Sequence, residues 1–149
     1  MWERHLKEYQ NLFCRVEFAV SEENADLPTN VLLKEYQEGI CHPYLEELYF
    51  QYGRYLLISA SRPGTYPANL QGTWSQYGSS PWSSGYWHNI NVQMNYWPAF
   101  NTNLLELFET YVAYWKAYLP LAEENADRYI RTAFPERDAG DGKIGWTFG

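Results

Sequence analysis

The sequence predicts an all-α protein with one short strand near its N-terminus. Two stretches, residues 43–59 and residues 103–119, repeat apolar side chains at the three- and four-residue spacing of a helix face. Between them, residues 62–87 are rich in proline and glycine, and such a stretch cannot hold a long helix. The 149 residues are enough for one domain with a sizeable core. We therefore expect two well-defined helical regions joined by a long irregular loop.

The N-terminal elements are predicted from spacing and from end signals. Residues 2–13 place apolar side chains on one helical face, which predicts an amphipathic helix. Residues 15–20 then alternate polar and apolar side chains, which favours a short strand. Further along, Thr29 is suited to cap a helix over residues 30–38, and Gly39 is suited to end that helix in a left-handed conformation.

The first long helix is expected from Pro43 to about Ser59. Proline suits a first turn because its missing N–H would have no helical partner there. Glu46 and Glu47 lie near the positive end of the helix dipole, so they are better explained as helix-start residues than as catalytic carboxylates. The apolar stripe of this helix consists of Leu45, Leu48, Tyr49, Tyr52, Tyr55 and Leu56.

The loop over residues 62–87 is predicted to be functional, since loops of this length without regular structure are otherwise uncommon. After the loop, a helix is expected to begin inside residues 91–95 and to run into Phe100. Pro98 is compatible with this helix because it removes only a backbone donor that is already free in a first turn.

The longest helical pattern begins at Asn103. Glu106 follows three residues later, which is a capping-box arrangement, so both glutamate and asparagine are explained by the helix start. Pro120 interrupts the pattern, and residues 121–131 predict a continuing or kinked helix.

Side-chain amides fall on every second residue after His88. They are Asn89, Asn91, Gln93 and Asn95. An extended chain would place all four on one face. Because amides donate and accept hydrogen bonds without carrying charge, such a row suits hydroxyl-rich ligands or a held water better than phosphates or metals. Trp82, Trp87 and Trp97 lie close by in sequence, and flat aromatic faces beside hydrogen-bonding groups fit a sugar ring.

Both features also have a purely structural interpretation. Buried amides often satisfy backbone groups around a tight loop, and tryptophans pack more often than they bind ligands. On these residues alone the structural interpretation is slightly favoured.

Composition excludes several classes of partner. The net charge of −7 would repel a phosphate backbone, and no basic cluster offsets it, so nucleic acid is not expected as a partner. No apolar stretch approaches the about 20 residues of a membrane helix. Cys14 and Cys41 are isolated in sequence, which predicts buried thiols rather than a zinc or redox site. Aromatic residues make up 19% of the chain, which agrees with a carbohydrate site and also with a dense core.

Three sequence blocks together resemble glycoside hydrolase family 95. They cover residues 50–64, residues 67–72 and residues 89–99, in the order that the family shows. Members of this family are α-L-fucosidases built on an (α/α)6 toroid of six helical hairpins. The resemblance implies a partial toroid here, with residues 1–28 as a connector helix and strand and residues 29–149 as the N-terminal part of the catalytic domain.

A whole toroid needs about twelve helices of roughly ten or more residues each. We therefore expect the chain to be part of a longer enzyme, with the remainder of its own polypeptide as a partner. Alone it is expected to be inactive and poorly soluble, because helix faces would lack their neighbours. No cofactor and no metal are expected, the source is expected to be bacterial, and a secreted or cytoplasmic location stays open.

The resemblance also implies a catalytic role for two asparagines. In the family, the residues that match Asn89 and Asn91 hold and polarise the attacking water together with a carboxylate further along the polypeptide. A glutamate, also further along, is the general acid, and neither carboxylate has a matching position in this chain. Direct attack by water would invert the anomeric centre.

The neighbouring residues are expected to contact the sugar. His88 directly precedes Asn89 and is expected to line the sugar pocket, although many family sequences carry their histidine one place earlier. Trp82 and Trp87 are candidates for stacking on the sugar, with loop packing as an equal alternative.

These predictions favour hydrolysis of terminal α-L-fucosyl linkages in fucosylated oligosaccharides or glycans. An α-L-galactosidase of the same family is the first alternative, since α-L-galactosides differ only by a hydroxyl on C6. A non-catalytic carbohydrate-binding protein is the second.

Overall fold

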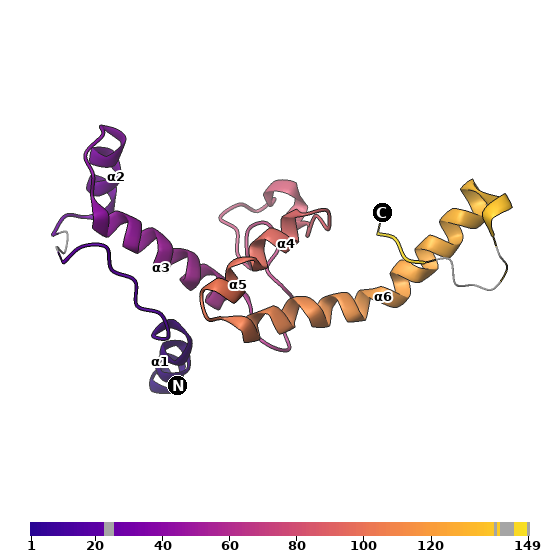
Figure 1. The fold of residues 1–149 in the computed structure, drawn as a ribbon, viewed down its shortest axis with the longest axis horizontal. Helices are drawn as coiled ribbons and strands as arrows, with labels where there is room; N and C mark the ends of the chain where they lie inside the picture. The colour runs from indigo at the N-terminus through magenta and orange to yellow at the C-terminus, as the bar shows by residue number, and fades with distance from the viewer. Residues whose placement is uncertain (23–25, 139, 141–144, 149) are drawn as a thin grey trace.

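A computed structural model of the protein describes residues 1–22, 26–138, 140 and 145–148. All elements of this part of the chain are helical, which confirms the predicted all-α class, and α6 reaches away from the other helices (Figure 1). The elements are α1 (Trp2–Phe13), α2 (Thr29–Gln37), α3 (Pro43–Ala60), η1 (Pro81–Ser84), α4 (Asn91–Tyr96), α5 (Pro98–Asn101), α6 (Leu105–Ala133) and η2 (Pro135–Arg137).

Helices α1 and α3 begin and end within a residue of the predicted positions. Gly39 follows α2 with a left-handed φ of +89°, as expected for a residue that ends a helix. Thr29, however, is the first residue of α2 and not its cap. The carbonyl of Pro28 accepts the N–H groups three and four residues further on, so the helix starts earlier than predicted.

Residues 15–20 do not form the predicted strand, since no described residue pairs with them in a ladder. The segment instead bonds to side chains of α3. The N–H of Val20 donates to Glu47 Oε1 at 2.7 Å, and Gln51 Nε2 donates to the carbonyl of Val16 at 3.2 Å. Because these side chains satisfy its backbone groups, an extended segment is stable here without a neighbouring strand.

The junction between α5 and α6 also differs from the prediction. Asn103 has a left-handed φ of +56° and α6 begins at Leu105, so the expected capping box is absent. The Glu106 carboxylate instead pairs with Arg15 at 2.5 Å. Pro120 lies inside α6, which continues to Ala133. The prediction that the helix continues over residues 121–131 is therefore confirmed.

The buried core lies where α1, α3, α4, α5 and the start of α6 meet. Its buried side chains include Leu12, Leu57, Ile58, Tyr96, Ala99, Leu104 and Leu107. Tyr96 is only 1% exposed and ends α4, so the short helix that begins at Asn91 is anchored in the core at its far end.

A polar centre lies beside this core, around Arg54, whose side chain is 2% exposed. The guanidinium donates to the carbonyls of Leu12, Phe13 and Thr102 at 3.0, 2.7 and 3.3 Å, and to Gln51 Oε1 at 2.8 Å. Leu12 and Phe13 end α1, where carbonyls lack helical partners. One arginine therefore ties α1 and α3 to the turn between α5 and α6.

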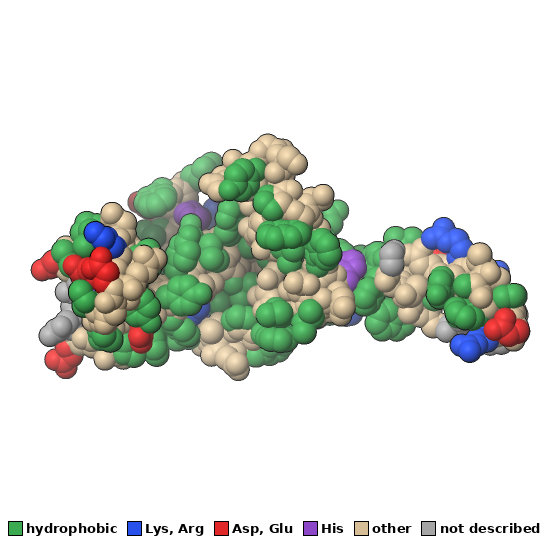
Figure 2. Space-filling view, turned by 90° about the horizontal axis from the view of Figure 1, so that it is seen from above, with side chains coloured by type: hydrophobic (Ala, Val, Ile, Leu, Met, Phe, Trp, Pro, Cys, Tyr) green, Lys and Arg blue, Asp and Glu red, His purple; other side chains and the backbone are tan. Residues whose placement is uncertain are grey.

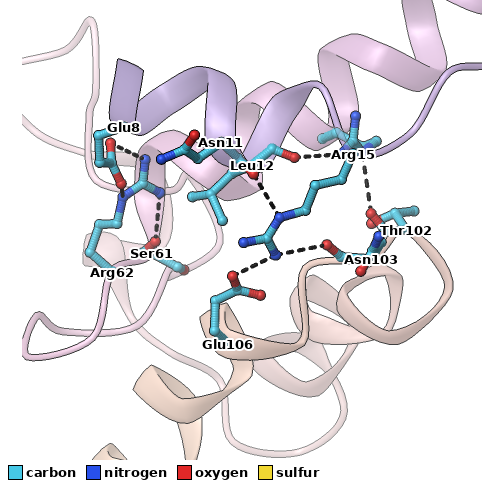
Figure 3. A network of polar contacts seen from close by, with 10 residues as sticks. Glu8, Asn11, Leu12, Arg15, Ser61, Arg62, Thr102, Asn103 and Glu106 are labelled. Carbon is cyan, nitrogen blue, oxygen red and sulfur yellow. Dashed lines mark hydrogen bonds and ion pairs between the residues drawn. The ribbon is translucent and has the colours of Figure 1, made fainter. Parts of the chain in front are cut away.

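Two further arginines form ion pairs that join α1 and the segment after it to other elements, as Figure 3 shows. Arg62 pairs with Glu8 at 2.9 Å, which joins the end of α3 to α1. Arg15 bonds to the carbonyl of Asn103 and to Glu106, which joins the segment after α1 to the start of α6. Charged side chains thus join α1, α3 and the start of α6 beside the core.

Apolar side chains are spread over the surface, as Figure 2 shows for one face. A groove of about 730 Å³ between α2 and α3 is lined by Thr29, Leu33, Tyr36, Leu45, Glu46, Leu48, Tyr49 and Tyr52. Tyr49 is 81% exposed, and Tyr52 and Tyr55 are exposed as well. The tyrosines of the predicted α3 stripe therefore face outward, whereas Leu45 is buried.

Cys14 and Cys41 are exposed free thiols, so the prediction of buried thiols is wrong. Each cysteine lies just outside a helix, Cys14 after α1 and Cys41 before α3. None of the helices in the described part of the chain is long and apolar enough to span a bilayer.

Candidate functional site

Two neighbouring side chains of α4 hold the beginning of the long loop. Asn95 Nδ2 donates to the carbonyls of Ala68 and Asn69 at 3.2 and 2.9 Å. The hydroxyl of Tyr96 accepts the N–H of Ala68 at 2.7 Å and lies 2.6 Å from Ser61 Oγ. Burial raises the pKa of Tyr96, so this phenol is neutral at neutral pH. The start of the loop is therefore fixed against α4.

Gln71 closes the middle of the loop. Its Nε2 donates to the carbonyl of Pro81 at 2.5 Å, and its Oε1 accepts the hydroxyl of Ser80 at 2.9 Å. Gly72 follows with a left-handed φ of +76° and lies under the ring of Trp74. A Cβ at Gly72 would come within 3.1 Å of that ring, so glycine is required here for space as well as for conformation.

The segment from Trp82 to Ile90 has an unusual backbone. Positive φ angles between 52° and 71° occur at Trp82, Ser83, Ser84, Trp87 and Ile90. Such angles are uncommon outside glycine and costly for a β-branched residue such as Ile90, so surrounding contacts must hold them. Two backbone bonds do so at the start of α4: Val92 N–H donates to Trp87 at 3.3 Å, and Met94 N–H donates to Ile90 at 2.9 Å.

The four amides do not share one face, so the extended interpretation is wrong. α4 begins at Asn91, and helical residues two apart point in different directions. The amides are divided by their partners instead. Asn95 holds the loop, and Gln93 Nε2 donates to the carbonyl of His88 at 2.6 Å. Asn89 and Asn91 are exposed, and within the described residues neither side chain makes a hydrogen bond.

The structural interpretation of buried amides therefore fits Gln93 and Asn95. Asn89 and Asn91 do not satisfy any protein group in the part of the chain that the structure describes, and their amides are open to a ligand. Their assignment as catalytic residues stays a prediction.

Trp82 and Trp87 are 65% and 52% exposed, and neither ring contacts another aromatic ring among the described residues. The Trp87 ring lies beside Gly85, where an added Cβ would come within 3.1 Å of the indole nitrogen. Packing thus occupies one edge of Trp87, and much of both rings remains accessible. Such surfaces could stack on a sugar, and this role stays a prediction.

His88 lies in a cluster of aromatic rings. Rings with centroids 4.9 to 6.3 Å from the imidazole belong to Tyr86, Tyr114, Trp115, Tyr118 and Phe148. His88 Nε2 lies 2.5 Å from the hydroxyl of Tyr114. Burial lowers the pKa of His88, which favours the neutral imidazole. Its predicted place in the wall of a sugar pocket stays a prediction.

The site has no carboxylate beside its two exposed asparagines in the described part of the chain. There, no carboxylate bonds to Asn89 or Asn91. No group of three or more His, Cys, Asp or Glu side chains suited to a metal ion comes together in the same residues. The groove between α2 and α3 is lined by other residues and is mostly apolar. The exposed amides can orient a polar ligand, but an amide does not itself transfer protons.

Two residues that shape the site were not predicted from the sequence. Gln71 bonds to Pro81 ten residues away, and no local pattern indicates such a bond. Tyr114 lies four residues before Tyr118, which predicts that the two rings share a helix face. That spacing gives no indication that Tyr114 meets His88.

A family model and several known proteins match this chain, and all of them indicate the same family. A sequence model of the Glycosyl hydrolase family 95 catalytic domain matches residues 1–147. The probable alpha-fucosidase A of Aspergillus niger is 46% identical over 135 residues, which is 87% of this chain and 16% of that protein. Alpha-L-fucosidase 2 of Arabidopsis thaliana is 43% identical over 123 residues, which is 78% of this chain and 14% of that protein.

A further similar protein, the probable alpha-fucosidase A of Aspergillus oryzae, is 46% identical over 86 residues, covering 57% of this chain and 12% of that protein. The chain thus spans between 12% and 16% of the length of these curated relatives. The relatives are fungal and plant proteins, so the expected bacterial source stays a prediction.

Proposed function

This chain belongs to glycosyl hydrolase family 95, and on that premise we propose that it supplies the water-positioning part of an α-L-fucosidase active site. The substrates would be glycans or oligosaccharides with terminal α-L-fucosyl residues. Residues 1–28 would form the connector and residues 29–149 part of the toroid. Because the relatives are several times longer than the chain, the proposed activity is that of an enzyme that carries this chain.

The observation that carries the proposal is the contrast among the amides of one short segment. Gln93 and Asn95 bond to backbone carbonyls. Asn89 and Asn91, in the same segment, are exposed and make no hydrogen bond within the described residues. An amide that stabilises nothing in the described fold is free to act on a ligand or on water.

The chemistry of an amide limits what these residues can do. The amide oxygen of asparagine is barely basic, so Asn89 and Asn91 would not remove the proton of the attacking water. They would orient the water so that a lone pair points at the anomeric carbon, while a carboxylate from elsewhere in the enzyme accepts the proton. A second carboxylic acid would protonate the leaving oxygen.

The exposed tryptophans support a sugar as the ligand. Trp82 and Trp87 present accessible ring faces beside Asn89 in sequence, and the apolar C–H face of a fucose ring could stack on such a surface. A hydroxyl on C6 would distinguish L-galactose from L-fucose, and a direct comparison of turnover of the two aryl glycosides measures this preference.

The stereochemistry of the product tests the proposed mechanism. Amides do not form glycosyl esters, so water should attack directly and an α-L-fucoside should first release β-L-fucose. This route needs the acid and the base about 6.5 to 9.5 Å apart, whereas a covalent route needs about 5.5 Å. Proton NMR of the anomeric signals in the first minutes, before mutarotation, distinguishes the two. Initial release of α-L-fucose would reject the role assigned to Asn89 and Asn91.

A further inference from the structure

The imidazole of His88 is held by contacts from two distant parts of the chain. Tyr114, Trp115 and Tyr118 approach it from α6, with ring centroids 5.6, 4.9 and 5.3 Å away. Phe148 approaches it from the C-terminal segment at 5.5 Å. That segment is joined to α6 by the N–H of Thr147, which donates to the carbonyl of Ala122 at 3.0 Å. Among these contacts, only Tyr114 makes a hydrogen bond to the imidazole.

The His88 imidazole and the Tyr114 hydroxyl are both neutral when they form their hydrogen bond. Burial raises the pKa of Tyr114 to about 12, helped by the neighbouring Tyr86 and Tyr118. Burial also lowers the pKa of His88. The titratable groups that face the imidazole are these three tyrosines, and no charged side chain contacts it within the described residues. At neutral pH the Tyr114 hydroxyl donates to Nε2 when the imidazole proton is on Nδ1, and it accepts from Nε2 in the other tautomer; either arrangement holds the ring.

The backbone of His88 is held as well as its ring. Its carbonyl accepts Gln93 Nε2 at 2.6 Å, so the residue is fixed from α4 on one side and from α6 on the other. The next residue is Asn89, and the flanking residues Trp87 and Ile90 both have left-handed φ angles. Such angles persist only where surrounding contacts hold the backbone, and the fixed His88 is one of these contacts.

We propose that Tyr114 is a positioning residue, which holds the imidazole of His88 and thereby sets the direction in which Asn89 presents its amide. The inference rests on the proposed function of Asn89. In this account the His88 ring acts through its covalent neighbour Asn89, and Tyr114 does not touch the substrate. The positioning role adds Tyr114 to the site, 25 positions after Asn89 in the chain.

Tyr114→Phe tests this role, because it removes the hydroxyl and keeps the ring. Tyr118→Phe is the matched control: its ring also contacts His88, but its hydroxyl makes no hydrogen bond among the described residues. In the enzyme that carries this chain, Tyr114→Phe should lower kcat for an aryl α-L-fucoside by about tenfold, since a small misplacement of a positioned group is costly. KM should change by less than about twofold, and Tyr118→Phe should change neither constant appreciably.

A second measurement is independent of activity. Hydrogen–deuterium exchange followed by mass spectrometry reports on the amides of Val92 and Met94, whose bonds to Trp87 and Ile90 close the segment. Loss of the hydrogen bond should raise exchange of the peptide covering residues 86–96 by about fivefold in Tyr114→Phe and not in Tyr118→Phe. The glutamine amide of His88→Gln reaches about as far as Nε2. This variant should therefore keep more protection against exchange in the same peptide than His88→Ala does.

Equal exchange in the two tyrosine variants, or equal loss of kcat in both, would overturn the positioning role. Wild-type enzyme without turnover of any α-L-fucoside would instead refute the proposed function. The exchange comparison would then still decide whether Tyr114 holds the segment.

Discussion

The hydrogen-bond network around Arg54 and the segment from Trp82 to Asn91 use polar side chains in opposite ways. Arg54 is buried and gives its donors to three backbone carbonyls and to Gln51. Asn89 and Asn91 are exposed and give none to the described part of the protein. The first arrangement stabilises the fold, and the second leaves hydrogen-bonding capacity for a ligand.

Helix α4 also contains both kinds of polar side chain, those bonded to the protein and those exposed. Asn95 and Tyr96 bond to the loop at Ala68, whereas Asn91, one turn earlier, points its amide at solvent. Residues of one type, a few positions apart, thus separate into structural and available groups.

The largest effect is expected from Arg54→Met. The substitution keeps an apolar stem of similar length but leaves the carbonyls of Leu12, Phe13 and Thr102 without their donor in a buried place. We expect a loss of about 3 kcal/mol or more in the free energy of unfolding, measured by chemical denaturation. Arg128→Met is the control, because Arg128 is exposed and its side chain, among the described residues, hydrogen-bonds to Asn125 alone, on the same helix. A loss as small as in the control would contradict a structural role for Arg54.

A smaller loss is expected from Tyr96→Phe. The variant keeps the buried ring but removes the hydroxyl that accepts the Ala68 N–H and bonds to Ser61. The unpaired N–H should cost about 1 to 3 kcal/mol of unfolding free energy. Tyr129→Phe, at a residue that is 58% exposed, should cost almost nothing. An unchanged stability in Tyr96→Phe would show that the loop is not held through this hydroxyl.

The smallest effect is a dependence of stability on pH at His88. Burial lowers the pKa of His88 in the folded chain below 6.5, which is its ordinary value. In the unfolded chain the imidazole is free of this burial and has the ordinary pKa. The unfolded state therefore takes up protons first, and stability should fall as the pH drops below 6.5. Unfolding free energies compared between about pH 7.5 and about pH 5.5 measure this fall. His88→Gln should show a shallower slope of unfolding free energy against pH, and an identical slope would contradict a half-buried neutral imidazole.

Local sequence patterns were sufficient for α1 and α3 but not for the start of α6 or for the partners of polar side chains. The spacing within α1 and α3 predicted both helices closely, since an apolar face and a first-turn proline are local signals. Residues 15–20 alternate as a strand does, but the groups that satisfy them, Glu47 and Gln51, lie on a helix about thirty positions away. Periodicity does not contain that information.

The candidate site shows the same limit. The loop was predicted from its proline and glycine content, and the assignment of Asn89 and Asn91, still a prediction, came from the resemblance of the sequence blocks. The separation of these two amides from Gln93 and Asn95 depends on where α4 begins. His88 was assigned to the sugar pocket as the neighbour of Asn89, and its contact with Tyr114 is set by the packing of α6 against the segment. Such contacts between distant residues are decided by the fold.

The most direct test of the account compares three alanine substitutions in the enzyme that carries this chain. Asn89→Ala and Asn91→Ala should each lower kcat for an aryl α-L-fucoside by about a hundredfold or more, with an almost unchanged Tm, because these amides would act on the water and not on the fold. Asn95→Ala should lower Tm, because it removes the donor to Ala68 and Asn69. If Asn89→Ala or Asn91→Ala instead lowers Tm as Asn95→Ala does, and the folded fraction keeps full activity, the two asparagines are structural and the central claim is wrong.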